Sequence, residues 1–124
     1  MAAVILIVED QPLHAKLFRD ILQLGGFDAI TAASGREATR VAAGARPDLI
    51  LLDVLLPDVD GRDVIATLKR GAATRGIGVL AISASPDREV MDDCLAAGAE
   101  AFLPKPVRMA DLLAGVRTML DARG

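Results

Sequence analysis

Short, continuous apolar runs alternate with stretches of helical periodicity along the whole chain. The first such run is Val4–Val8, and further runs at 27–32, 48–53, 77–83 and 101–104 are predicted as strands. A strand that is apolar at every position is typical of a sheet covered by helices on both faces. Strands that are separated by helices pair in parallel. The alternation therefore predicts an α/β fold, a doubly wound (βα)5 unit with one five-stranded parallel sheet.

The segments between the strands carry the start and stop signals of helices. Pro12 suits a first helical turn, and Gly25 with Gly26 ends that helix. Ser34 and Glu37 stand three residues apart, which is the capping-box spacing at the start of a second helix. Apolar residues at helical spacing are expected to form the buried face of the first helix: Leu13, Leu17, Phe18, Ile21 and Leu22.

The later helices are predicted in the same way. A third helix should follow the turn LPDVDG at 56–61. Ser85 is predicted as the N-cap of the fourth helix and Pro86 as its first residue, with Gly98 closing it. The apolar face of the fourth helix is expected to consist of Val90, Met91, Cys94 and Leu95. The last helix should be lined by Met109, Leu112, Leu113, Val116 and Leu120.

Composition and charge limit the function classes. The 124 residues suit a single domain over 1–124, with its core at about 4–120. The 14 basic and 17 acidic residues give a net charge of −3, and the basic residues are scattered, so no nucleic-acid partner is predicted. The longest apolar run, 1–8, is far shorter than the ~20 residues of a membrane helix and lacks the features of a signal peptide. We expect a cytoplasmic protein, and its single cysteine, Cys94, excludes an internal disulfide.

Polar residues stand where the predicted strands end. Glu9 and Asp10 follow the first strand, Asp53 ends the third, Ser83 ends the fourth and Lys105 follows the fifth. Because the carboxyl ends of parallel strands lie along one edge of the sheet, ligands bind there. The apolar runs are therefore interpreted as a scaffold, and these five residues as the candidate site.

Three acids, a hydroxyl and a lysine favour phosphoryl transfer. Two carboxylates about 4 Å apart repel by roughly 4 kcal/mol near a protein surface, so a cation is expected. Oxygen ligands indicate a hard ion, Mg²⁺ or also Mn²⁺, with positions left open for phosphate oxygens. In such a site the protein positions and neutralises the transferred group. Asp53 is then a candidate nucleophile that forms an aspartyl phosphate.

The segments "ILIVED", "PDLILLDVLLPDVDG", "AISAS" and "KP" together resemble the receiver domain of bacterial two-component response regulators. The resemblance runs from Val4 to about Leu120. It implies the flavodoxin-like, CheY-like fold with strand order 2-1-3-4-5. It also implies that Asp53 is the phosphoacceptor and that Mg²⁺ is held by Glu9, Asp10, Asp53 and the backbone carbonyl of Leu55.

The resemblance assigns roles to three further residues. Ser83 should contact the phosphoryl group, Lys105 should pair with it, and Phe102 stands at the position of the family's rotamer-switching aromatic residue. The Lys105–Pro106 bond is expected to be cis. Two positions depart from the common pattern, because Glu9 replaces an aspartate and Ser83 replaces a threonine. Pro104 removes a backbone donor, which an edge strand tolerates.

The resemblance also implies partners. A sensor histidine kinase or a histidine phosphotransfer protein would supply the phosphoryl group, and the chain would catalyse its own phosphorylation and dephosphorylation. A downstream protein would bind the face formed by the fourth helix, the fifth strand and the fifth helix. We expect a stand-alone receiver with no output domain, either a monomer or a dimer that forms on phosphorylation.

Two other classes share features with this sequence. A small flavodoxin-like nucleotide or flavin binder would have the same fold, but Glu9 and Asp10 occupy the place of its phosphate-binding loop. A haloacid-dehalogenase-like phosphatase also uses an aspartate and magnesium, but it carries a second aspartate where this chain has Leu55. His14, one turn into the first helix, is interpreted as an ordinary exposed helical residue.

Overall fold

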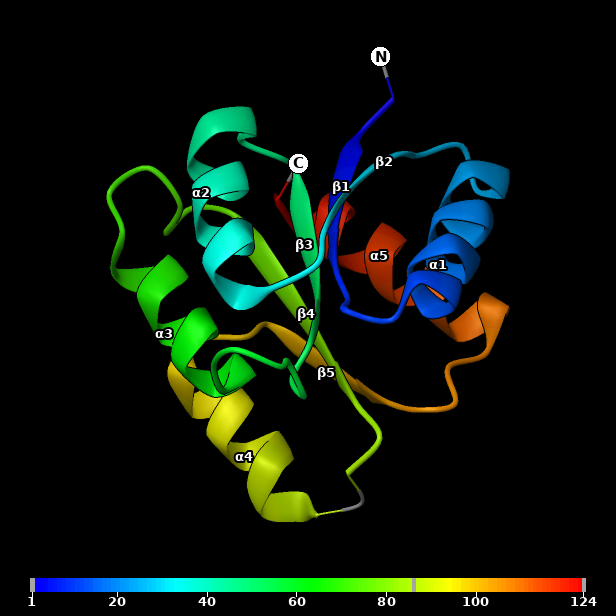
Figure 1. The fold of residues 1–124 in the computed structure, drawn as a ribbon. Helices are drawn as coiled ribbons and strands as arrows, with labels where there is room; N and C mark the ends of the chain where they lie inside the picture. The colour runs from blue at the N-terminus through cyan, green and yellow to red at the C-terminus, as the bar shows by residue number, and fades with distance from the viewer. Residues whose placement is uncertain (1, 86, 124) are drawn as a thin grey trace.

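The computed structural model describes residues 2–85 and 87–123 and contains one five-stranded sheet. Every pair of neighbouring strands is parallel, and the order is β2-β1-β3-β4-β5 (Figure 1). This confirms the predicted fold class and strand order. The strands are β1 (Val4–Val8), β2 (Asp28–Ala32), β3 (Leu49–Asp53), β4 (Gly78–Ser83) and β5 (Ala101–Pro104).

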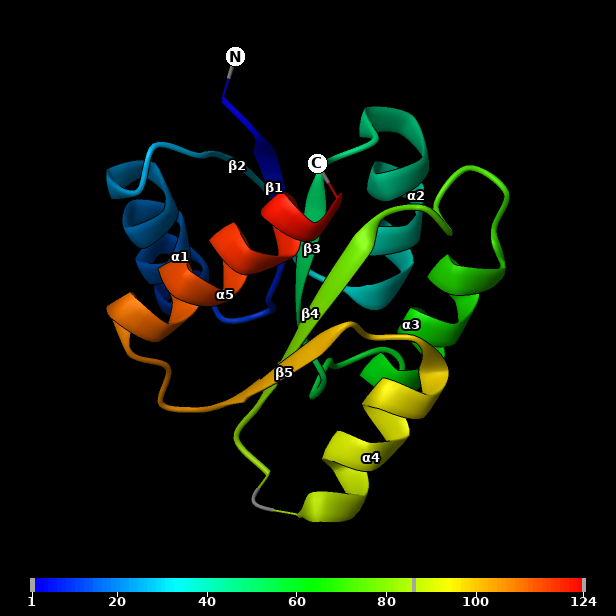
Figure 2. The same cartoon turned by 180° about the vertical axis from the view of Figure 1, so that it is seen from behind.

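Four helices connect the strands, a fifth follows the last strand, and together they cover both faces of the sheet. Helices α1 and α5 lie on one face, and α2, α3 and α4 lie on the other (Figures 1 and 2). Among the residues that the structure describes, none of the helices is long and apolar enough to cross a membrane. Their bounds are α1 (Pro12–Leu24), α2 (Gly35–Ala45), α3 (Gly61–Arg70), α4 (Arg88–Ala97) and α5 (Met109–Arg123).

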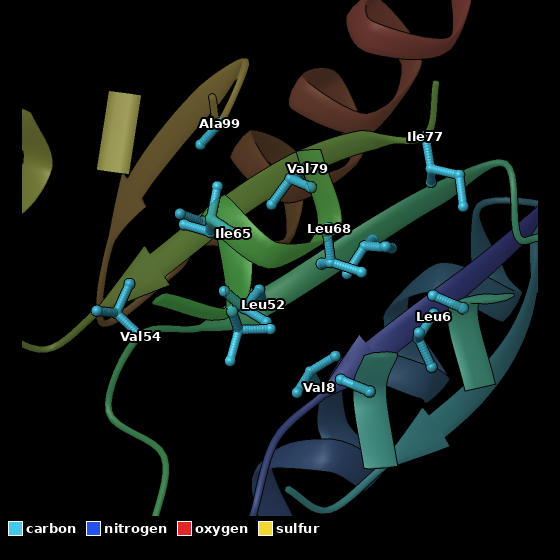
Figure 3. Packing of buried hydrophobic residues seen from close by; sticks show 14 of the residues in the cluster. Leu6, Val8, Leu52, Val54, Ile65, Leu68, Ile77, Val79 and Ala99 are labelled. Atoms are coloured by element: carbon cyan, nitrogen blue, oxygen red, sulfur yellow. The ribbon is translucent and has the colours of Figure 1, made fainter. Parts of the chain in front are cut away.

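The sheet separates two hydrophobic cores. Successive side chains of a strand point to opposite faces, so Leu51 packs with the α1 and α5 side while Leu52 packs with the α2–α4 side. Figure 3 shows the second of these cores, a cluster that includes Leu6 and Leu52 of the strands and Ile65 of α3. A strand that serves both cores must be apolar throughout, which explains the continuous apolar runs.

Some residues predicted to be buried are exposed. In α1, Phe18, Ile21 and Leu22 are buried, but Leu13 is 80% exposed and Leu17 is 54% exposed. The prediction was wrong for these two leucines because α1 buries a narrower stripe than its apolar residues cover. Leu95 of α4 and Met109 of α5 are also exposed.

The helix starts differ in detail from the prediction. The N-cap of α4 is Asp87, so the prediction of Ser85 as N-cap was wrong; Pro86 lies outside the described residues. Ser85 instead forms a turn, in which its hydroxyl oxygen accepts a hydrogen bond from the backbone N–H of Asp87 at 3.4 Å. At α2 the Ser34 hydroxyl oxygen accepts from the Glu37 N–H at 3.2 Å, as predicted for an N-cap.

Candidate functional site

The acidic residues predicted at the strand ends come together. Strands β1 and β3 are neighbours, with Val8 opposite Leu52, so the residues that follow them lie side by side. One carboxylate oxygen from each of Glu9, Asp10 and Asp53 lies within 4.8 Å of the others. Glu9 and Asp53 are buried, with 2% and 3% of their surface exposed, and Asp10 is half-buried.

Lys105 reaches into this cluster from the segment between β5 and α5. Its Nζ donates to Asp53 Oδ2 at 2.9 Å and to Glu9 Oε2 at 3.2 Å. The backbone N–H of Lys105 donates to the Ser83 carbonyl at 2.9 Å, which fixes the segment to the end of β4. The ammonium also lies 6.0 Å from the centre of the Phe18 ring, within the range of a cation–π contact.

Burial and charge shift the protonation of this cluster. The pKa of Glu9 is raised from its ordinary 4.5 to about 7, first by burial and then by the adjacent Asp53 carboxylate, while Lys105 lowers it by less. Burial alone would lower the pKa of the Lys105 ammonium, but Asp53 and Glu9 together outweigh it and raise that pKa. Three carboxyl groups and one ammonium thus leave an excess of negative charge.

This donor set fits a hard divalent cation. Its three converging side chains offer only carboxylate oxygens, the ligands that Mg²⁺ and Mn²⁺ prefer. Leu55 lies in the loop after β3, where its N–H donates to Asp53 Oδ1 at 2.9 Å. Its backbone carbonyl as a fourth ligand stays a prediction.

Ser83 and Phe102 lie on neighbouring strands beside the cluster. Ser83 is fully buried, and its hydroxyl oxygen accepts from the N–H of Ser85 at 3.1 Å. Within the described part of the chain, the Ser83 hydroxyl makes no hydrogen bond to Asp53 or Lys105. Phe102 is half-buried against the core beneath α2–α4. The switch roles of Ser83 and Phe102 stay predictions.

The loop after Asp53 is held at both ends by contacts that the sequence analysis did not identify. Asp58 Oδ1 accepts from the N–H of Gly35 at 2.9 Å and Oδ2 from the N–H of Arg36 at 3.0 Å. The hydrogen bond from Gly35 lowers the pKa of Asp58. Gly61 packs on the backbone of Val54, where a Cβ at position 61 would lie 2.5 Å from Val54 Cα.

His14 also belongs to the site, although the sequence analysis set it aside. Its Nδ1 lies 3.4 Å from Lys105 Nζ and 3.6 Å from Glu9 Oε1. The signal for this position was its place in the first helix, one turn beyond Asp10. A helix that begins at the edge of the sheet turns its early residues back toward that edge.

An acidic cluster and a lysine at the carboxyl edge of a 2-1-3-4-5 sheet define a recognised class of signalling domain. The chain belongs to the response regulator receiver domain family, whose profile matches residues 5–117. The polar-differentiation response regulator DivK of Brucella ovis is 35% identical over 120 residues, which cover 97% of this chain and 98% of that protein. The resemblance found in the sequence is thereby confirmed.

Solved structures agree with this membership. A CheY-like receiver domain protein from Methanospirillum hungatei has a TM-score of 0.93 and 27% identity, covering 99% of this chain and 97% of that one. The receiver domain of a sensor histidine kinase from Pseudomonas aeruginosa has a TM-score of 0.90 and 28% identity, covering 98% and 99%. That domain holds a magnesium ion in its active-site cleft.

Proposed function

We propose that this protein is the phosphoacceptor of a two-component pathway or phosphorelay and that Asp53 receives the phosphoryl group. The observation that carries the proposal is the ammonium of Lys105, 2.9 Å from Asp53 Oδ2 among three converging carboxyl groups. The family match favours this function over a flavin or nucleotide binder and over a haloacid-dehalogenase-like phosphatase. A sensor histidine kinase or a histidine phosphotransfer protein is the proposed donor.

The transfer requires an attacking oxygen and charge neutralisation. A carboxylate oxygen of Asp53 attacks the phosphorus of a phosphohistidine, the P–N bond breaks, and its electron pair goes to the imidazole, which takes up a proton from water. Lys105 balances charge on the oxygens of the transferred group. A divalent cation, when bound, supplies further neutralisation of those oxygens. Glu9, Asp10, Asp53 and the Leu55 carbonyl would hold it, and the magnesium in the Pseudomonas aeruginosa relative supports Mg²⁺.

Phosphorylation then acts as an electrostatic switch. The new group adds a charge of about −1.5 to −2 and strong acceptor oxygens at Asp53. The Ser83 hydroxyl exchanges its bond to the Ser85 N–H for one to the phosphoryl group, and Phe102 fills the space that Ser83 leaves. The face formed by α4, β5 and α5 changes shape and binds the downstream protein. Water later hydrolyses the acyl phosphate.

The donor protein is proposed to dock on α1. Leu13 and Leu17 are 80% and 54% exposed, and they lie one turn apart on the helix that carries His14 and begins at the acidic cluster. An apolar surface continuous with the site favours a protein that must bring its phosphohistidine to Asp53. Leu13→Ser should therefore slow phosphorylation by a phosphotransfer protein and leave phosphorylation by acetyl phosphate unchanged. Equal slowing with both donors would argue against this docking surface.

The direct test is the mass of the protein after incubation with acetyl phosphate and Mg²⁺. The wild-type chain should gain one phosphoryl group, and Asp53→Asn should gain none. Asp63→Asn is the matched control, because Asp63 is an exposed carboxylate on α3. Phosphorylation of Asp53→Asn at the wild-type level would assign the acceptor to another residue and overturn the proposal.

A further inference from the structure

The ammonium of Lys105 has as many acceptors around it as it has N–H groups. A lysine ammonium carries three donors. Asp53 Oδ2 lies 2.9 Å from Nζ, Glu9 Oε2 lies 3.2 Å away, and His14 Nδ1 lies 3.4 Å away. Two of the acceptors are carboxylates of the proposed cation site. The third, the imidazole of His14, stands outside that set.

The contact with the ammonium favours one tautomer of His14. An ammonium has no lone pair, so Nδ1 accepts a hydrogen bond from it only when the neutral ring carries its proton on Nε2. Glu9 Oε1 lies 3.6 Å from the same Nδ1 and would accept from it in the opposite tautomer. Lys105 and Glu9 therefore favour opposite tautomers of His14, and the position of the ammonium decides between them.

His14 is held where it lies by its helix. It stands in the first part of α1, which begins at Pro12 directly after the acidic pair, and Phe18 anchors the same helix in the core. Lys105, in contrast, is a long side chain on the segment between β5 and α5, only 13% exposed and tied at Nζ to three partners. The backbone of His14 is therefore held beside the ammonium by a helix, and an acceptor placed in this way can position the end of a long side chain.

We propose that His14 positions Lys105 during phosphoryl transfer. This inference rests on the proposed function. The two carboxylate partners of Lys105, Glu9 and Asp53, are also proposed to bind the cation, and Asp53 is proposed to receive the phosphoryl group. Once Asp53 and Glu9 are so engaged, His14 is the acceptor that still holds the ammonium beside Asp53. His14 thus acts through Lys105 and does not itself touch the phosphoryl group.

Three substitutions at position 14 test the role of Nδ1. Asparagine carries its Oδ1 as many bonds from Cα as histidine carries Nδ1, so His14→Asn keeps an acceptor in place. His14→Gln moves the acceptor one bond farther out, and His14→Ala removes it. Gln23→Ala is the control on the same helix, because Gln23 is exposed and is not among the contacts of Lys105.

The first measurement is the phosphorylation rate with acetyl phosphate at saturating Mg²⁺. His14→Ala should lower the maximal rate constant by about three- to tenfold, as expected for the loss of one hydrogen bond of ordinary strength. The dissociation constant for Mg²⁺ should change by less than about twofold, since no cation ligand is removed. His14→Asn should restore most of the rate, His14→Gln less, and Gln23→Ala should match the wild type. A wild-type rate for His14→Ala, or equal loss in His14→Asn and His14→Ala, would overturn the proposal.

The second measurement needs no phosphorylation. Long-range ¹H–¹⁵N spectra of the cation-free protein, recorded about two pH units above the usual histidine pKa of about 6.5, report the tautomer of His14. The wild type should show Nδ1 without a proton. Lys105→Met should move the proton to Nδ1, where it is donated to Glu9. An unchanged tautomer in Lys105→Met would show that Nδ1 does not accept from the ammonium and would overturn the inference.

The two measurements separate this inference from the proposed function. If wild-type protein binds Mg²⁺ but takes no phosphate, the proposed function is wrong, and with it the catalytic part of the role given to His14. If wild-type protein is phosphorylated normally but the rates or the tautomer contradict the expectations above, only the role of His14 is wrong.

Discussion

Glu9 carries the most strongly perturbed carboxyl group of the site, and its protonation should govern stability in the absence of a cation. The folded protein keeps this proton up to about pH 7, whereas the unfolded chain loses it near the ordinary value of 4.5. Between about pH 4.5 and pH 7 the folded state therefore binds more protons than the unfolded chain. The free energy of unfolding falls as the pH rises through this range and stays lower above about pH 7.

Glu9→Gln should remove this pH dependence. In EDTA above pH 7 the variant should be more stable than wild type by an amount of up to about 3 kcal/mol, and the difference should vanish below about pH 4.5. Urea unfolding at a series of pH values measures both limits. A constant difference between wild type and Glu9→Gln across the whole series would contradict a raised pKa at Glu9.

Lys105 balances two buried carboxyl groups when no cation is bound. Lys105→Met leaves Asp53 and Glu9 without their ammonium, so in EDTA the free energy of unfolding should fall by about 2 to 4 kcal/mol. Added Mg²⁺ should recover more stability in the variant than in wild type, because a cation replaces the missing charge. Urea titrations with and without Mg²⁺ provide the check, and an equal Mg²⁺ effect in both proteins would argue against a shared site.

Most of the candidate site could be predicted at the level of residues. Glu9, Asp10, Asp53 and Lys105 were found because parallel strands place their carboxyl ends together, and this placement follows from strand order. The contact of His14 with Lys105 could not be found in this way, since it depends on how far α1 is rotated about its axis. The Ser83 hydroxyl was also expected near the phosphoryl position, but which hydrogen bond it makes without a phosphoryl group depends on the local turn at Ser85.

At the scale of elements, the junction between β3 and α3 is held by close backbone contacts. The N–H of Gly61 donates to the Val54 carbonyl at 2.9 Å, and Leu55 pairs with Asp60 across the loop. A side chain at position 61 would press against backbone atoms of Val54, which cannot rotate away. The start of α3 is thereby fixed next to Asp53.

Gly61→Ala should destabilise the protein by about 2 to 3 kcal/mol, the cost of overpacking against rigid backbone. It should also slow phosphorylation, because Val54 follows Asp53 directly. Gly44→Ala is the control: it lies inside α2 with open space around its Cβ position, so the change should be neutral or stabilising by up to about 1 kcal/mol. Thermal unfolding of the two variants compares the sites, and similar shifts in both would contradict the backbone contact.

Element boundaries and exposed faces were predicted less completely than element order. The start of α4 falls at Arg88 with Asp87 as its cap, because Ser85 is used in a turn instead. Leu13 and Leu17 have the spacing of a buried face. Helical spacing alone does not predict how wide a stripe of the α1 surface the sheet and α5 cover. Such details depend on contacts between elements that are distant in sequence.

The whole molecule is held together by strands that supply both cores. Leu51 and Leu52 are adjacent in β3 and both fully buried, yet they belong to cores on opposite faces of the sheet. A cavity in either core loosens the same strand. The two layers should therefore unfold together and not one after the other.

Leu51→Ala and Leu52→Ala should each lower the free energy of unfolding by about 2 to 5 kcal/mol and keep a single transition. The chain has no tryptophan and no tyrosine, so far-ultraviolet circular dichroism and amide NMR signals are the suitable probes. Two separate transitions in either variant would show that the layers on the two faces of the sheet are independent.

The two hydrogen bonds that Asp58 accepts from the start of α2 affect how the receiver meets its donors. With the loop tied to α2 on one side and to Val54 on the other, the surroundings of Asp53 are ordered during folding and not on encounter. The conformational entropy that is lost when these surroundings become ordered is then lost during folding, and it is not lost again in each reaction. A preorganised acceptor of this kind needs only a reactive phosphorus atom from its donor. The groups that promote the transfer then belong to the receiver, and the choice of the correct donor must come from the surfaces on which the two proteins bind each other.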